Sequence, residues 1–286
     1  MKPYEKITDQ IIDLLEQGVC PWKHYLNSSI IQAPQNYTSK REYNGFNHMW
    51  LSFFQRFKGY QSSEWLTFKQ AKNLNGTIKK GSKGVPVIYY DVMHLDANNN
   101  KVSEELAVKK VPFLKVFTVF NMEQTEGIEW SPVEAEAKEI NPIEAAEEII
   151  NHMPNAPKIT YGGTGAYYRP SIDTVNVPKI ADCTSEEEYY STLFHELVHA
   201  TGHESRLNRK EITEKVNFGS QIYSKEELTA ELGAAFLCSE AGISEHVIEN
   251  QAAYLQGWLK ALKSDKKMIF DASAKAGQAA KYIIGG

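Results

Sequence analysis

The feature that most constrains this chain is the pentapeptide His195-Glu196-Leu197-Val198-His199. Residues four apart lie on one face of a helix, so both imidazoles can reach one ion while Glu196 reaches the water bound to that ion. The flanking sequence predicts this helix, because Ser185 with Glu188 three residues later is typical of a capping box and Gly202 marks an end. The motif therefore predicts a helix that carries two ligands of a zinc ion and a general base.

Two histidines leave such a site incomplete, because a catalytic zinc normally has three protein ligands. A second helix predicted over residues 224–237 places Glu227 and Glu231 on one face, with small residues that allow close approach to the first helix. The spacing resembles that of glutamate-zincins, which implies Glu227 as the ligand and Glu231 as the acid that holds a ligand histidine. In the alternative, Glu227 is the capping-box partner of Ser224 and Glu231 is the ligand. The sequence does not separate the two.

His203 offers another third ligand, because a histidine also follows the glycine in the motif of metzincins. In those proteins it comes three residues after the glycine, whereas His203 follows Gly202 directly, so a place just beyond the helix end is favoured. With a metal bound, Glu196 is suited to act as a general base in the hydrolysis of a peptide bond. For Tyr167, Tyr168 and Arg169, core or substrate-positioning roles are favoured over stabilisation of an oxyanion.

The net charge of −5 is unevenly distributed between the two halves of the chain. Residues 1–130 contain sixteen Lys and Arg against thirteen Asp and Glu, a net charge of +3, which leaves −8 for the remainder. Five lysines and no acidic residue lie in the segment 69–90, next to aromatic side chains, a mixture that favours non-specific binding of single-stranded nucleic acid. In the alternative, the aromatic residues belong to the core and the lysines are an ordinary solvated face. The predicted nucleic-acid-binding residues are Trp22, Arg41, Tyr43, Asn47, Trp65, Lys69, Lys79, Lys80 and Lys83.

The hydrophobic pattern predicts an α+β protein with two domains. A small N-terminal domain with an antiparallel sheet is expected over residues 1–127, an acidic linker over 128–141, and a mainly helical domain with a minor sheet over 142–286. The expected helices cover residues 4–18, 63–71 and 142–151, and the expected strands cover 85–90, 112–120, 158–161 and 173–177.

Several classes of protein are disfavoured by composition. The three cysteines form no CxxC pair, which argues against a disulfide framework and against a cysteine-based zinc site. No apolar run approaches the length that crosses a bilayer, so no membrane partner is expected. The first residues lack the pattern of a secretory signal, which makes the cytoplasm the expected location.

Rare residue strings in both halves resemble ArdC-type antirestriction proteins. In the first half these are 43–47 (YNGFN), 65–71 (WLTFKQA), the lysine-bearing 76–84 and 119–127 (VFNMEQTEG); in the second they are 166–170 (AYYRP), 195–203 (HELVHATGH), 205–207 (SRL) and 226–231 (EELTAE). The resemblance implies an N-terminal domain that binds single-stranded DNA and a zincin-like metallopeptidase domain.

It also implies a protein of a plasmid, an integrative element or a phage, which protects incoming single-stranded DNA from restriction. Three hypotheses follow: a DNA-binding zinc metalloprotein of this type, a protease whose N-terminal domain selects a protein substrate such as a host restriction or defence factor, and a DNA-binding protein whose zinc is structural.

Overall fold

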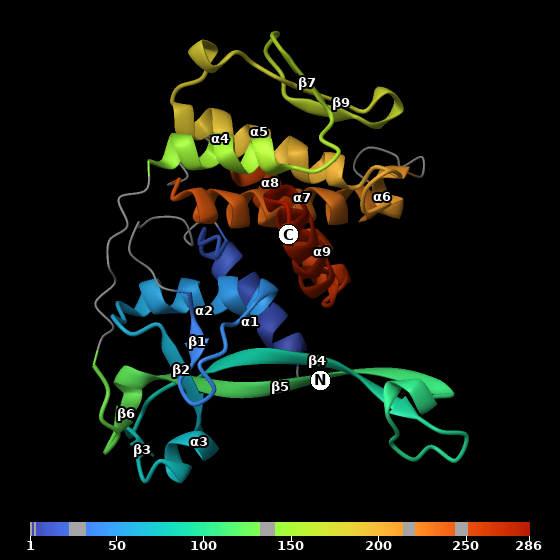
Figure 1. The fold of residues 1–286 in the computed structure, drawn as a ribbon. Helices are drawn as coiled ribbons and strands as arrows, with labels where there is room; N and C mark the ends of the chain where they lie inside the picture. The colour runs from blue at the N-terminus through green and yellow to red at the C-terminus, as the bar shows by residue number, and fades with distance from the viewer. Residues whose placement is uncertain (1, 3, 23–32, 132–140, 214–220, 244–250) are drawn as a thin grey trace.

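The computed structural model describes residues 2, 4–22, 33–131, 141–213, 221–243 and 251–286. Its first half is a small sheet flanked by helices, and its second half is mainly helical, which confirms the predicted α+β class (Figure 1). Along the first half the elements are α1 (Glu5–Glu16), β1 (Gln35–Asn36), α2 (Gly45–Lys58), β2 (Glu64–Thr67), α3 (Phe68–Asn73), β3 (Thr77–Ile78), β4 (Val85–Leu95), β5 (Lys109–Asn121) and β6 (Thr125–Glu126).

The second half begins with a helix, continues with a short sheet and ends in packed helices (Figure 1). Its elements are α4 (Pro142–His152), β7 (Lys158–Tyr161), β8 (Tyr167–Arg169), β9 (Thr174–Val177), α5 (Glu186–Thr201), α6 (Lys210–Thr213), α7 (Gln221–Ala241), α8 (Gln251–Ser264) and α9 (Met268–Ile284). Among the described helices, none combines the length and the apolar character that a membrane span requires.

The N-terminal sheet has the strand order β1-β2-β5-β4, and a separate pair joins β3 to β6. Strands β4 and β5 form an antiparallel hairpin in which Val85 pairs with Val119 at one end and Leu95 pairs with Lys109 at the other. Two strands joined by an exposed loop were predicted here, but the paired arms are longer than the apolar runs indicated. In the second half, β9 lies between β7 and β8 and is parallel to β7.

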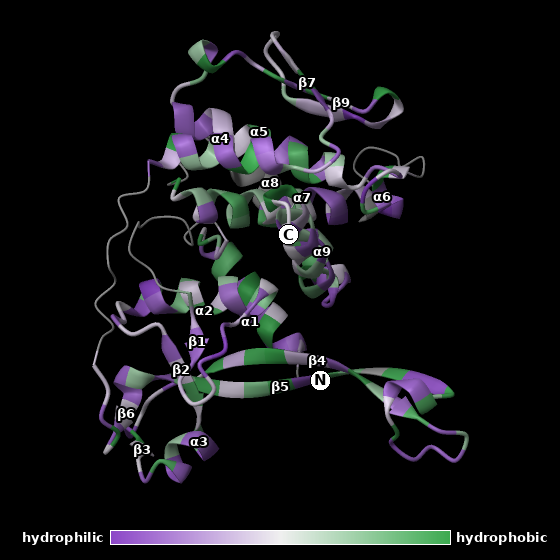
Figure 2. Cartoon of the chain, in the orientation of Figure 1, coloured by the Kyte–Doolittle hydropathy of each residue, from purple (hydrophilic) through white to green (hydrophobic). Residues whose placement is uncertain are grey.

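One large hydrophobic core joins the two halves of the chain. Buried residues of α1 and α2 pack in the same cluster as residues of α7, α8 and α9, including Leu228, Trp258 and Met268. Trp22 lies edge-on against Trp258, with ring centroids 5.3 Å apart. Figure 2 shows hydrophobic residues interspersed with hydrophilic ones along these helices. Helix α7, which carries Glu227 and Glu231, therefore packs directly on the N-terminal half.

Two local predictions were wrong, and each has a physical reason. The segment predicted as one helix over residues 63–71 begins as strand β2, because Trp65 and Leu66 lie on opposite faces of the sheet and enter different cores. The helix begins only after Thr67, whose side chain forms the capping box with Gln70. Ser224 was expected to begin the second helix but lies inside α7, so the alternative in which it caps that helix together with Glu227 does not hold.

Candidate metal centre

Helix α5 brings the two histidines of the pentapeptide to one face. The hydroxyl of Ser185 accepts a hydrogen bond from the backbone of Glu188 at 3.1 Å and so begins the helix as predicted. The carboxylate of Glu188 accepts a hydrogen bond from Thr184 instead of completing a capping box with Ser185. The Nε2 atoms of His195 and His199 lie 3.1 Å apart.

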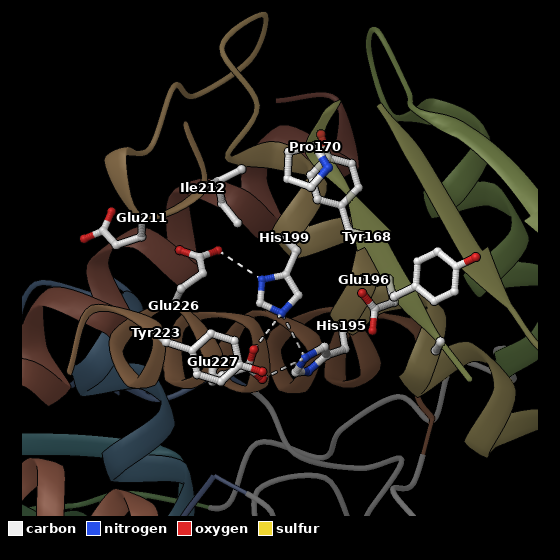
Figure 3. Close-up of a pocket in the computed structure, with 12 residues that line it drawn as sticks. Tyr168, Pro170, His195, Glu196, His199, Glu211, Ile212, Tyr223, Glu226 and Glu227 are labelled. Carbon is white, nitrogen blue, oxygen red and sulfur yellow. Dashed lines mark hydrogen bonds and ion pairs between the residues drawn. The ribbon is translucent and has the colours of Figure 1, made fainter. Parts of the chain in front are cut away.

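Helix α7 packs along α5 and supplies the acidic side chains. Close approach is possible because Gly233 faces Val198, and a Cβ atom at that glycine would lie 2.7 Å from a methyl group of the valine. This is the small-residue contact that the sequence indicated. It places Glu227 opposite the space between the two imidazoles (Figure 3).

Three side chains converge with the separations that one ion requires. The carboxylate of Glu227 lies 3.6 Å from Nε2 of His195 and 3.6 Å from Nε2 of His199. Ligand atoms held tetrahedrally at 2.0–2.2 Å from zinc lie about 3.4 Å from one another. The three residues also form a group whose ligand atoms lie within 4.8 Å of one another. Their donor set, two imidazoles and one carboxylate, therefore fits a divalent ion.

The remaining predicted candidates lie outside this group. Glu231 approaches the other nitrogen of His195, with Oε1 3.8 Å from Nδ1, so its position suits an acid that orients the histidine. His203 lies beyond the helix and its Nδ1 pairs with the hydroxyl of Ser205 at 2.8 Å. The geometry thus favours Glu227 over both Glu231 and His203 as the third ligand.

A second carboxylate, which the sequence analysis did not assign, holds the other histidine. Glu226 is buried, and its Oε1 lies 3.2 Å from Nδ1 of His199 (Figure 3). An imidazole that donates its Nδ1 hydrogen to this carboxylate presents Nε2 as a lone-pair donor. Each predicted ligand histidine therefore has its own acidic partner, Glu226 for His199 and Glu231 for His195.

Arg209 fixes Glu226 in a buried network. Its guanidinium donates to both carboxylate oxygens of Glu226, at 2.6 and 3.1 Å. It also donates to the hydroxyl of Thr201 and to the carbonyl oxygen of Val198, both in α5. The network joins the end of α5 to α7 through one planar, fully charged side chain. Because Arg209 lies in a connecting segment, no periodic pattern pointed to it.

The charges of the site shift the pKa values of its members. Burial lowers the pKa of His195, but the carboxylates of Glu227, Glu231 and Glu196 outweigh burial and raise that pKa to about 9. Burial raises the pKa of Glu227, yet the two imidazoles beside it bring the value down to about 2. In the metal-free protein at neutral pH, a protonated His195 therefore forms an ion pair with the carboxylate of Glu227. A metal that binds there must displace this proton.

The three residues open into a cavity of about 320 Å³. Glu196 lines it beside the histidines and is only 8% exposed, which suits a base that acts on water inside a shielded site. Tyr223 of α7 also lines the cavity and hydrogen-bonds to Glu227. The other lining residues are Ala166, Tyr167, Tyr168, Pro170, His195, His199, Glu211, Ile212, Glu226 and Glu227.

The two tyrosines that precede the site have different roles: Tyr168 is held by hydrogen bonds, and Tyr167 is accessible. Tyr168 donates its hydroxyl hydrogen to Asp173 at 2.8 Å, and Arg206 donates to the same hydroxyl. Burial and the neighbouring carboxylate raise the pKa of Tyr168, so its phenol stays protonated. Tyr167 is 44% exposed and lines the cavity, where its side chain is available to a substrate. The guanidinium of Arg169 lies over the ring of Tyr167.

The prediction that Trp22 and Trp65 bind nucleic acid is wrong in this structure. Both side chains are 0% exposed and belong to the large core. A base can stack only on an accessible ring face, so these rings stabilise the fold instead. Composition counts aromatic residues but does not distinguish a buried ring from an exposed one, and this explains the error.

Two further predicted nucleic-acid residues also have structural partners. The side-chain amide of Asn47 donates to the carbonyl of Ile88 at 2.7 Å, and its oxygen accepts from the backbone NH of the same residue at 2.9 Å. Asn47 thus fastens α2 to the outer edge of β4. Tyr43 is half-buried, its hydroxyl accepts a hydrogen bond from the side-chain amide of Asn36, and burial raises its pKa.

The predicted cationic residues all reach solvent. Arg41, Lys69, Lys79, Lys80 and Lys83 are exposed, and the ammonium group of Lys79 also donates to the carbonyl of Glu123. Beside Lys69, the ring of Phe68 is 61% exposed. Phe68, unlike Trp65, is therefore an accessible aromatic residue next to a lysine.

The fold and the site define a zincin-like domain that follows a small N-terminal domain with a sheet and helices, and comparison with known proteins supports both parts. The family model for a zincin-like metallopeptidase matches residues 144–275, and that for the N-terminal domain of anti-restriction factor ArdC matches residues 1–120. The chain belongs to the ArdC family of antirestriction proteins.

Solved structures and curated relatives extend the similarity over the whole chain. Crystal structures of antirestriction protein ArdC from plasmid R388, one metal-free and one with Mn(II), match with a TM-score of 0.75 and 33% identity, covering 99% of this chain and 97% of theirs. Uncharacterized protein y4eC of Sinorhizobium fredii is 34% identical over 98% of this chain and 91% of its own length. DNA primase TraC of Escherichia coli is 33% identical, but the chain spans only 20% of that protein. The Mn(II)-bound relative and the donor set together indicate a divalent metal.

Proposed function

We propose that residues 142–286 form a zinc-dependent peptidase. The observation that carries the proposal is the convergence of His195, His199 and Glu227, with Glu196 beside them in a shielded cavity. Two imidazoles and a carboxylate are the donor set of many catalytic zinc sites, and three protein ligands leave room for water. Zinc, when bound there, supplies Lewis-acid polarisation of the scissile carbonyl.

The residues of the chain perform the remaining steps. Glu196 takes a proton from the attacking water and passes it to the nitrogen of the leaving amine. Glu226 and Glu231 lie beside Nδ1 of the two imidazoles, which leaves Nε2 of each free to hold a zinc ion. Tyr223 and Tyr167 border the cavity and are placed to contact the substrate.

The substitution Glu196→Gln tests this proposal, because it removes the base and leaves the ligands in place. We expect the variant to retain its metal and to lose peptide hydrolysis by about 10²-fold or more. Glu186→Gln, an exposed change in the first turn of the same helix, is the matched control and should hydrolyse like the wild type. Equal hydrolysis by Glu196→Gln and wild type would contradict the assignment.

We further propose that residues 1–127 bind single-stranded DNA and that the protein protects incoming DNA of a mobile element. Support comes from the exposed lysines of residues 69–83, from the exposed ring of Phe68 and from the match to the ArdC N-terminal domain. Salt dependence of the affinity measures how many phosphates are neutralised. Lys79→Ala with Lys80→Ala should weaken binding and flatten the salt slope by about one per lysine. Lys158→Ala with Lys179→Ala, exposed lysines of the second half, should leave both unchanged.

Protection assays separate binding from proteolysis. If the Glu196→Gln variant still protects DNA fully from restriction, protection depends on binding alone and the metal has another role. If it binds DNA normally and protects poorly, a protein substrate such as a restriction factor is supported.

A further inference from the structure

The β4–β5 hairpin carries an exposed aromatic surface that none of the functions above uses. Its arms extend beyond the helices that cover the rest of the sheet (Figure 1). In the register of the pair, Tyr89 lies opposite Lys115, and the neighbouring pairs on the same face contain Phe113 and Phe117. We call Tyr89, Phe113, Lys115 and Phe117 the hairpin face.

The rings of the hairpin face form a contiguous group. The ring of Tyr89 lies 6.3 Å from that of Phe113 and 6.1 Å from that of Phe117, between centroids. Tyr89 and Phe117 are 48% and 45% exposed. Large aromatic residues at this exposure, gathered on one face of a strand pair, mark a site of interaction.

The charges beside the rings favour an anionic partner. The thirteen residues of β5 include three lysines and no acidic residue. The ammonium group of Lys115 lies 5.2 Å from the centroid of the Phe113 ring. Within the described part of the chain, neither Lys109 nor Lys115 forms a salt bridge, whereas Lys110 pairs with Glu104 at 2.6 Å. One acidic residue, Asp91, lies on the same face and accepts a hydrogen bond from Tyr89.

Aromatic rings interleaved with lysines on an open sheet are the surface that unpaired bases prefer, because every base presents a stacking face and every nucleotide a phosphate. The rings of Phe113 and Phe117 are tilted by 49° and 76° from that of Tyr89. A flexible single strand can turn successive bases onto such rings, whereas the bases of a duplex are already stacked.

We propose that the hairpin face is a stacking platform for single-stranded DNA. The proposal rests on the DNA binding proposed above and assigns it a second surface besides the lysines around Phe68. The platform supplies base stacking, and the lysines of β5 hold the adjacent phosphates. It follows that a single strand of the same length should bind more tightly than the duplex.

The double substitution Tyr89→Ala with Phe117→Ala tests the platform by fluorescence anisotropy with a labelled oligothymidine. We expect affinity to fall about tenfold or more, with the salt slope unchanged because the phosphate contacts remain. Tyr89→Phe with Phe117→Tyr retains both rings and should bind like the wild type. Tyr161→Ala removes a ring 60% exposed on β7 and should also bind normally.

The outcomes separate the two proposals. If the wild type does not bind the strand even at low salt, the proposed DNA binding fails. If the wild type binds and the Tyr89→Ala, Phe117→Ala variant binds equally well, only the platform is overturned. A wild-type dimer that this variant converts to a monomer without a change in DNA affinity would also overturn it, since the face would then hold a second copy.

Discussion

Gly233 is the position at which the packing of α5 against α7 can be tested most directly. In Gly233→Ala, the added Cβ would lie 2.7 and 2.9 Å from the two methyl groups of Val198. Carbon atoms prefer separations of about 3.5–4.0 Å, so the helices must separate by about 0.8 Å. Val198 cannot turn aside, because a β-branched side chain in a helix has essentially one rotamer.

Moving α5 and α7 apart should affect metal affinity more than the free energy of unfolding. Overpacking costs about 1–3 kcal/mol, but alanine is about 1 kcal/mol better than glycine in a helix, so the net loss is about 0–2 kcal/mol. Glu227, however, would move away from imidazoles that now lie 3.6 Å from it, further from the separation of about 3.4 Å that suits a tetrahedral ion. We expect metal affinity to fall about tenfold or more, since ligand displacement near 1 Å is costly.

Isothermal titration with zinc and chemical denaturation measure the two effects on the same preparations. Gly277→Ala is the matched control in α9, where an added Cβ meets open space, and it should stabilise the protein by about 1 kcal/mol with metal affinity unchanged. Val198→Ala combined with Gly233→Ala should recover affinity, because the clashing methyl groups are gone. Wild-type zinc affinity in Gly233→Ala alone would show that the spacing of α5 and α7 at Gly233 does not position Glu227.

Two further predictions concern the charges of the site. Arg209→Met leaves the buried carboxylate of Glu226 without its cation and should lower the free energy of unfolding, measured by urea denaturation, by about 3–5 kcal/mol. Adding Glu226→Gln to the same chain should recover part of this loss. An unchanged denaturation midpoint in Arg209→Met would contradict the prediction. Because the pKa of His195 is raised to about 9 in the metal-free protein, zinc must displace a proton, so zinc affinity should rise with pH up to about 9 and then level off. The same proton stabilises the metal-free fold fully below the unfolded pKa of about 6.5, and that contribution is lost as pH rises through about 9. Titrations in buffers of different ionisation enthalpy would show about one proton released per ion at pH 7.5, and a flat pH profile would contradict the prediction.

The sequence predicted the histidines of α5 well, because their relation depends only on the geometry of one helix. Glu227 and Glu231 could not be separated in the same way. They lie one turn apart on one face, and the choice depends on how α7 approaches α5 at Gly233, a contact between helices. The position of Ser224 inside α7, which removes the capping alternative, also appears only in the folded chain.

Interactions between distant segments account for what the sequence did not predict. Arg209 reaches Glu226 from a connecting segment, so no helical period relates the two. Trp22 and Trp65 were assigned to a surface, but both are buried in the core that the two halves share. The burial of Trp22 depends on a contact with Trp258 of α8, and that of Trp65 on the side of the sheet that its ring takes. The core shared by the two halves could not be predicted either, because hydrophobic periodicity is a property of one segment and does not show which segments pack together.

The assignment of His195, His199 and Glu227 as the zinc ligands can be tested by zinc stoichiometry and affinity in four matched preparations: wild type, His195→Ala, Glu227→Gln and Glu231→Gln. We expect one zinc ion per wild-type chain and none in His195→Ala or Glu227→Gln. Glu231→Gln should bind one zinc ion with an affinity about 10–100-fold lower. Full zinc at wild-type affinity in Glu227→Gln, together with loss of zinc in Glu231→Gln, would show that Glu231 is the third ligand instead.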